Sequence, residues 1–214
     1  MRFQSRPPCA TNRIKPSPPA RRAGGGAAIE FAIVLPLLLL MVLSIFDIAR
    51  AIQADMIMVS IGREGGSLAA RSSGYSYTQI MNSLAATTPP LDMNNRGMIY
   101  ITKIMAQAEA GGAVRNVVLE QYRWQQGFSQ SSYSPSSTVW NCANWANDGS
   151  CSGLPSPGAT SPTANVMTGK LAAGDVIYAV ETYYRYASLF GGINVGGSLF
   201  TPQFSDDLYA LTIF

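Results

Sequence analysis

A carboxylate at the start of a long apolar run, Glu30, is the residue whose position most needs an explanation. The run covers residues 27–46, twenty residues in which Glu30 is the only charged one. A carboxylate in a membrane-spanning segment costs up to about 3 kcal/mol at the bilayer centre and less near the interface. One interpretation is an interfacial glutamate that the dipole of the first helical turn favours. The other is a counter-ion for an amino group.

The cysteines are the second group with possible chemistry. Cys142 and Cys151 lie in a stretch rich in Ser, Asn and Gly that is typical of an exposed loop, and they enclose a turn signal, NDG at 147–149. Cys9 lies alone in the N-terminal tail. If the chain crosses a membrane between them, Cys142 and Cys151 can pair in an oxidising compartment. Such a disulfide would contribute on the order of 2 to 3 kcal/mol; the alternative is two unpaired thiols.

Histidine is absent from the sequence, which excludes Ser-His-Asp and Cys-His catalysis and imidazole metal sites. The carboxylates outside the apolar run that could suggest a hydrolytic or calcium site are Asp175, Glu181, Asp206 and Asp207. Single carboxylates on strand faces, and a pair before a strand, are usually solvated, which disfavours such a site. We therefore expect no catalytic residue, no metal and no cofactor, and read the protein as not an enzyme.

Charge is unevenly distributed along the chain. There are 15 Lys and Arg residues against 12 Asp and Glu, but residues 1–25 hold six of the basic residues and no acid, which leaves the remainder at −3. The part able to fold has no basic stripe, so nucleic acid is not an expected partner. Only 13% of residues are charged, below the roughly 25% of soluble domains, which favours a membrane-linked or exported protein.

The chain divides into four segments. Residues 1–25 form a Pro- and Arg-rich leader, and residues 26–46 a transmembrane helix of roughly 30 Å. The basic flank predicts a cytoplasmic leader and an exported remainder. Residues 47–74 predict an amphipathic stalk helix, weakened at Gly62, Gly65 and Gly66, with an apolar stripe at Ile45, Ile48, Ile52, Met56 and Val59.

Residues 75–214 predict an exported domain with a disulfide loop. A helical pattern at 78–86 precedes four strand-like segments, at 97–105, 114–125, 175–187 and 208–213. A long Ser/Pro/Asn/Gly-rich insertion separates the second and third of these. The expected fold class is α+β, a long N-terminal transmembrane and stalk helix packed on a small antiparallel sheet.

The start of the apolar run resembles the prepilin class of proteins. Gly25, four residues from Gly26 to Ile29, then Glu30 and Phe31 match the cleavage pattern of Flp-type pilins. More closely, AAIEFAIVLPLLLLMVLSIFDIARA resembles the TadE-like pseudopilins of tight-adherence pilus systems. The resemblance implies cleavage between Gly25 and Gly26, with Glu30 and Phe31 in the processing and assembly motif. Glu30 would then face the new α-amino group of Gly26 or that of a neighbouring subunit.

The resemblance further implies a minor pilin or pseudopilin that acts in assembly of a Tad/Flp pilus. Its partners would be a prepilin peptidase, the major Flp-type pilin and other minor pilins, inner-membrane assembly components and the lipid bilayer. It would be a single-pass protein of a bacterial inner membrane, with its N-terminus cytoplasmic and its C-terminal domain periplasmic, or part of an extracellular pilus.

Three alternatives remain open. The chain could be a membrane-anchored exported binding or adhesion domain with no pilus role. An aromatic cluster would then offer an adhesive surface instead of sheet packing; its members are Tyr183, Tyr184, Tyr186, Tyr122 and Trp124. It could be an anchored enzyme, which the absent histidine disfavours. The apolar run could also be a secretory signal peptide cut after Ala51, although it exceeds the usual length of about 7 to 15 residues.

Overall fold

The computed structural model describes residues 26–71, 74–130, 133–188, 194–195, 198–199 and 207–214. The chain forms two compact units, Met1–Val42 and Leu43–Phe214. The first helix, α1 (Gly26–Arg71), runs through the boundary between them. The other elements are α2 (Tyr77–Ala86), α3 (Met93–Arg96), β1 (Gly97–Ala108), β2 (Val114–Arg123), α4 (Gln125–Gln130), β3 (Val176–Arg185), β4 (Asn194–Val195), β5 (Ser198–Leu199) and β6 (Asp207–Ile213).

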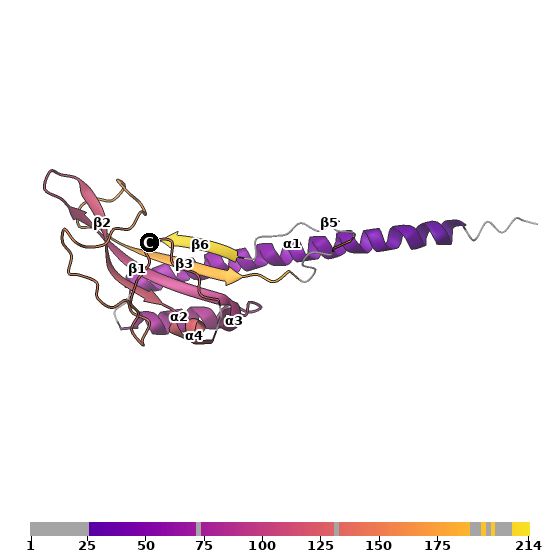
Figure 1. Ribbon diagram of the computed structural model, residues 1–214, viewed down its shortest axis with the longest axis horizontal. Coiled ribbons are helices and arrows are strands. Elements are labelled where there is room, and N and C mark those ends of the chain that lie inside the picture. The colour runs from indigo at the N-terminus through magenta and orange to yellow at the C-terminus, as the bar shows by residue number, and fades with distance from the viewer. Residues whose placement is uncertain (1–25, 72–73, 131–132, 189–193, 196–197, 200–206) are drawn as a thin grey trace, which may run out of the picture. The chain divides into compact units, whose positions relative to one another are not determined.

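An antiparallel sheet forms the centre of the second unit (Figure 1). Its strand order is β2-β1-β3-β6, and β4 and β5 form a separate two-stranded pair. The four long strands are the four segments that period-two alternation predicts, and β1 and β2 meet through a turn at Gly111 and Gly112, both with positive φ. The predicted α+β class, a long N-terminal apolar helix with a small antiparallel sheet, is confirmed.

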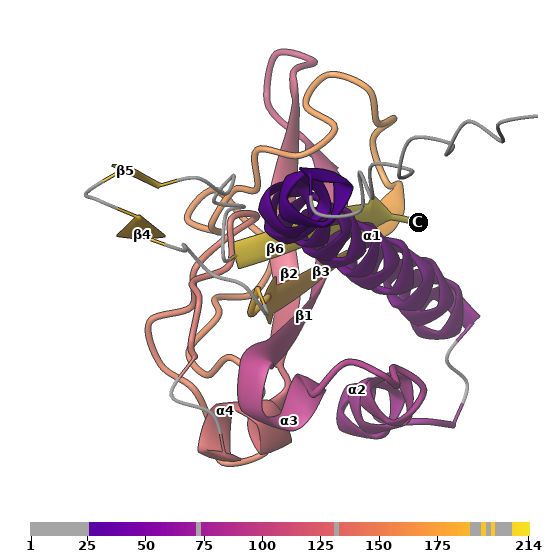
Figure 2. The same cartoon turned by 90° about the vertical axis from the view of Figure 1, so that its right-hand side faces the viewer.

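Helices cover one face of the sheet, and Figure 2 shows α1 and α2 side by side there. The face of α1 that packs is not the stripe of large apolar residues, because Ile45, Ile52 and Met56 are exposed. The buried residues of α1 are mostly small: Ala51, Ala54, Met58, Ile61, Gly62, Gly65, Gly66 and Ala69, together with Asp47. Small side chains allow the helix backbone to approach the sheet closely.

Three of the glycines of α1, Gly62, Gly65 and Gly66, are contact points. The helix continues through all three, where the sequence suggested that it weakens. A Cβ atom at Gly62 would lie 2.8 Å from Oγ1 of Thr212, and one at Gly66 would collide with the ring of Phe214. Because Gly62 meets Thr212 and Gly66 meets Phe214, this part of α1 runs in the same direction as β6.

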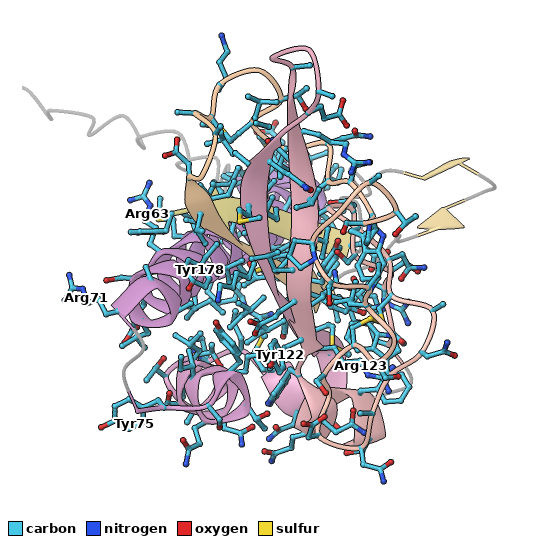
Figure 3. All side chains as sticks on the ribbon, turned by 90° about the vertical axis from the view of Figure 1, so that its left-hand side faces the viewer. Arg63, Arg71, Tyr75, Tyr122, Arg123 and Tyr178 are labelled. Carbon is cyan, nitrogen blue, oxygen red and sulfur yellow. A yellow bond between two sulfur atoms is a disulfide. The ribbon has the colours of Figure 1, made fainter. Side chains whose placement is uncertain are left out.

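The second helix begins at a capping box. The Ser76 hydroxyl accepts from the Gln79 backbone N–H at 3.3 Å, and the Gln79 side chain accepts from the Ser76 N–H at 3.0 Å. Tyr77 stacks on Tyr122 with ring centroids 4.5 Å apart, which ties α2 to β2. Figure 3 shows Tyr122 on the body of the domain, whereas Tyr75 points outward.

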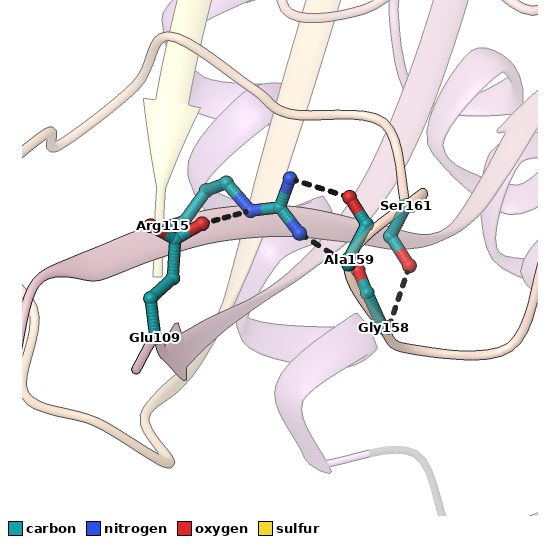
Figure 4. Close-up of polar contacts among 5 residues, drawn as sticks. All are labelled: Glu109, Arg115, Gly158, Ala159 and Ser161. Atoms are coloured by element: carbon teal, nitrogen blue, oxygen red, sulfur yellow. Dashed lines mark hydrogen bonds and ion pairs between the residues drawn. The ribbon is translucent and has the colours of Figure 1, made fainter. Parts of the chain in front are cut away.

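The long insertion between α4 and β3 covers the opposite face of the sheet. Val139, Ala164 and Val166 pack there against Ile104 and Val118. The Arg115 guanidinium donates to the carbonyls of Gly158 at 2.7 Å and Ala159 at 3.1 Å, and its Nε lies 3.0 Å from a Glu109 carboxylate oxygen (Figure 4). The insertion is therefore a third packed layer of the domain.

Candidate functional site

The residues of the predicted processing motif lie in the first two turns of α1. Gly26 begins the helix, and Glu30 and Phe31 follow on it, all exposed. Gly25, the other residue of the predicted cleavage site, lies outside the described residues. Positions 26 and 30 are four apart, so they share one face of the helix. A charge on the backbone nitrogen of Gly26 would therefore lie on the same side of the helix as the Glu30 carboxylate.

The helix that follows this motif is apolar on every side. All residues from 26 to 42 are exposed in the described chain, among them Phe31 at 61%. Within the described residues, α1 is the one helix long and apolar enough to cross a membrane, with a mean hydropathy of 2.7 over its most apolar eighteen residues. An apolar surface that the described residues leave exposed is compatible with a single-pass membrane anchor.

Asp47 anchors the sheet to α1 directly after this apolar segment. Its side chain is buried, and it accepts hydrogen bonds from the hydroxyl of Tyr186 at 2.9 Å and from the hydroxyl of Ser188. The Tyr186 hydroxyl also lies 3.0 Å from the Asp47 carbonyl. Burial, followed by the hydrogen bond to Asp47, raises the pKa of Tyr186 to about 12. Tyr186 thus keeps its proton at any ordinary pH and remains a donor.

Glu181 departs from the expectation of a solvated carboxylate. Its exposed fraction is 0%, and donors from the insertion and two tyrosines surround it. The donors are Thr138 N at 2.8 Å, Thr138 Oγ1 at 2.7 Å, Val139 N at 3.3 Å, the hydroxyls of Tyr183 at 2.8 Å and Tyr209 at 3.2 Å, and the hydroxyl of Ser137. These bonds compensate for burial of the carboxylate. Glu181 therefore fastens the insertion to the sheet.

Tyr183 shares this network. Burial raises its pKa, and the neighbouring Glu181 carboxylate raises it further. The hydroxyl consequently stays protonated and donates to Glu181. The tyrosine side chains at 183, 184 and 186 are all buried, so these rings pack within the domain and form no exposed adhesive surface.

The predicted disulfide between Cys142 and Cys151 is present, with Cα atoms 5.9 Å apart. Of the remaining carboxylates, Asp175 is exposed and accepts from the Ala172 N–H at 2.8 Å, and Asp207 lies 3.6 Å from Nε of Arg185. Asp206 is outside the described residues. The described part of the chain contains no group of three or more His, Cys, Asp or Glu side chains that could hold a metal ion.

The residues that the sequence singled out therefore do not form one site. The motif of Glu30 and Phe31 lies on the exposed apolar helix, whereas the disulfide and Glu181 lie in the folded unit. Sequence reasoning missed Asp47, although a signal was available. Asp47 lies on the same helix face as the apolar residues Ala51, Ala54 and Met58. A charged residue on an otherwise apolar face indicates that it has a buried polar partner.

Comparison with known proteins gives one finding, at the N-terminal end of the described chain. The family model described as TadE-like protein matches residues 25–66. Comparisons with curated proteins and with solved structures give no match. The matched segment includes Gly25, Glu30, Phe31 and most of α1. It supports association of the protein with a Tad pilus and pilus components as its partners.

Proposed function

We propose that this chain, which carries a TadE-like segment at residues 25–66, is a minor pilin or pseudopilin that acts in assembly of a Tad/Flp pilus. The observation that carries the proposal is the motif from Gly25 to Phe31 at the start of an apolar helix whose residues 26–42 are exposed in the described chain. The partners would be a prepilin peptidase, the major Flp-type pilin and other minor pilins, and inner-membrane assembly components.

Processing would consist of hydrolysis of the peptide bond between Gly25 and Gly26. The cut leaves a carboxylate on Gly25 and a new α-amino group on Gly26, which is protonated near neutral pH. The basic leader is removed, so the first charged side chain of the mature helix is Glu30. The protein is then a substrate of the peptidase and needs no catalytic group of its own.

Glu30 would neutralise an α-amino group in apolar surroundings. Within one chain, Gly26 and Glu30 lie on the same helix face; between subunits, the amine of a neighbour could reach Glu30 instead. Removing one partner of a buried ion pair leaves the other charge uncompensated, at a cost of about 3 to 5 kcal/mol. Glu30 is therefore expected to matter for assembly, and less for cleavage, because cleavage depends on the residue before the cut.

A second candidate function is a membrane-anchored exported binding domain with no pilus role. It is favoured by the second unit, Leu43–Phe214, which has hydrophobic clusters on both faces of its sheet and a disulfide-closed loop. In this alternative, residues 1–46 serve only as an anchor, and neither Gly25 nor Glu30 has a specific role.

The experiment compares four variants in a strain that lacks the native protein. Gly25→Leu should block cleavage and leave a full-length protein in the membrane without pilus function, whereas Ala23→Leu should be processed. Glu30→Gln should be largely processed but fail in assembly, whereas Glu64→Gln, at an exposed position of the same helix, should behave as wild type. Gel mobility reports cleavage, and pili sheared from the surface report assembly.

Normal piliation by uncleaved Gly25→Leu would contradict the pilin proposal and favour the anchored binding domain. Normal piliation by Glu30→Gln would show that Glu30 is only an interfacial glutamate and not a counter-ion needed for assembly.

A further inference from the structure

Three arginines of the described chain are half-buried, and they differ in their partners. Arg115 donates to two carbonyls of the insertion and lies 3.0 Å from Glu109. The Arg123 guanidinium lies 3.5 Å from the centre of the Phe128 ring. In contrast, Nη1 of Arg50 is buried and has no hydrogen-bond partner among the described residues. A buried N–H of a cation without an acceptor is unfavourable, so an acceptor at this position would stabilise the protein.

The carboxylate one turn before Arg50 on α1 does not supply that acceptor. Asp47 accepts from the hydroxyl of Tyr186 at 2.9 Å and from the hydroxyl of Ser188, and no hydrogen bond joins it to Nη1 of Arg50. The next acid along the helix, Asp55, is exposed. Within the described residues, Arg50 therefore retains a donor that an anion from another molecule can use.

A small hollow lies beside Arg50 in the folded unit. It is lined by Arg50, Gln53 and Ala54 of α1, by Pro90 and Leu91 of the segment between α2 and α3, and by Tyr186. Its volume is about 20 Å³, and a cavity of about 10 to 15 Å³ holds one group of the size of water. One oxygen atom can therefore enter beside the arginine, and the rest of a larger anion would remain at the mouth of the hollow.

The position of Arg50 along α1 places it at the end of the candidate membrane span. The apolar run ends at Phe46, and a rise of about 1.5 Å per residue puts Arg50 about 6 Å beyond it. The headgroup layer on each side of the hydrocarbon core is roughly 5 to 8 Å thick. Ile45 and Ile52, before and after Arg50, are 63% and 52% exposed, so the helix surface around it is apolar. With the apolar run across a bilayer, Arg50 lies at the depth of the lipid phosphates.

We propose that Arg50 and the hollow beside it bind the phosphate group of a membrane phospholipid. One phosphate oxygen would enter the hollow and accept a hydrogen bond from Nη1, and the fork of the guanidinium matches the oxygens of a phosphate group. The acyl chains would lie beside Ile45 and Phe46. Lipid phosphate is the anion that this depth supplies at the highest local concentration. The inference requires the membrane anchor, and it does not depend on a role in a pilus.

The test uses the full chain purified in dodecyl maltoside, a detergent without phosphate, and dioleoylphosphatidylglycerol as the probe. Native mass spectrometry counts the bound lipid while its concentration is raised. Dioleoylglycerol, which has the same acyl chains and no phosphate, is the control lipid. We expect saturable binding of the phospholipid, and binding of the control lipid that is weaker by about tenfold or more. Inorganic phosphate in millimolar excess should leave the phospholipid bound.

Substitutions of arginines on α1 locate the site. Arg50→Gln removes the charge and should weaken phospholipid binding about tenfold or more, because a hydrogen bond to a charged group is lost. Arg50→Lys keeps the charge and should bind more tightly than Arg50→Gln. Arg63→Gln removes an exposed arginine about 25 Å beyond Phe46 on the same helix, and should bind as wild type does. The midpoint of thermal unfolding without lipid checks that each variant is folded.

Equal phospholipid binding by wild type and Arg50→Gln would overturn the proposal. Equal binding of the two lipids by wild type would also overturn it, and this comparison decides even if the Arg50 variants do not fold. If inorganic phosphate displaces the phospholipid from wild type, the site takes a free anion and the assignment to a lipid is wrong. If wild type binds neither lipid, the hollow holds water only and the proposal fails.

Discussion

The two parts of α1 have the same secondary structure but opposite relations to their surroundings. From Gly26 to Val42 every residue is exposed, although the sequence is almost wholly apolar. From Leu43 to Arg71 the helix buries a face of alanines, glycines and Met58 against the sheet. Large apolar side chains therefore predominate in the part of the helix that is exposed in the described chain, and small side chains form the buried face of the other part.

Under the proposed function, the first part of α1 serves membrane insertion and assembly, and the second part serves the stability of the folded unit. Substitutions on the buried face of α1 after Leu43 should change the free energy of unfolding of the unit Leu43–Phe214, because they alter its core. Substitutions before Val42 should leave that free energy unchanged and act on insertion or assembly. Matched pairs of identical substitutions in the two parts test this separation.

Methionine truncation should give the largest contrast. Met58 is fully buried at 0% exposure, and Met41 is 57% exposed. Met58→Ala removes side-chain contacts from the core and should lower the free energy of unfolding by about 2 to 5 kcal/mol. Met41→Ala should change it by less than about 0.5 kcal/mol. Denaturant unfolding in detergent, followed by tryptophan fluorescence, measures both; equal losses would contradict the separation.

Loss of the Asp47 carboxylate should have an intermediate effect. Asp47→Ala leaves the hydroxyls of Tyr186 and Ser188 without this acceptor in a buried site, which should cost about 1 to 3 kcal/mol. Asp55→Ala, at an exposed position on the same helix, provides the control and should change stability little. The midpoint temperature of thermal unfolding is measured for both variants. An unchanged midpoint for Asp47→Ala would mean that Asp47 does not anchor the sheet.

The smallest expected effect on stability is that of Glu30→Gln. Glu30 is exposed in the described chain, so the free energy of unfolding should change by less than about 0.5 kcal/mol. The same variant should nevertheless fail in pilus assembly. If Glu30→Gln lowered the free energy of unfolding and also failed in assembly, Glu30 would act by stabilising the fold and not by a contact between subunits.

Sequence alone predicts the elements whose signals are local. Period-two alternation predicts the four long strands, and the apolar run predicts the helix from Gly26 onward. The loop between Cys142 and Cys151 is also local, since only nine positions separate the cysteines.

Features that depend on distant segments could not be predicted in this way. Glu181 was expected to be solvated, because on its own strand it is an isolated carboxylate. It is buried because Ser137 and Thr138 reach it from more than forty residues away. Likewise, Gly62, Gly65 and Gly66 indicated a weak helix, whereas the contacts of Gly62 and Gly66 with Thr212 and Phe214 at the end of the chain explain why only glycine fits there.

The N-terminus of the protein purified from membranes tests the central claim most directly. Edman degradation or mass analysis of the intact chain gives its first residue. Processing as a prepilin predicts a protein that begins at Gly26, with Glu30 as its fifth residue. A chain that still begins at Met1 would contradict the claim in favour of an uncleaved anchor, and one that begins at Ile52 would contradict it in favour of a secretory signal.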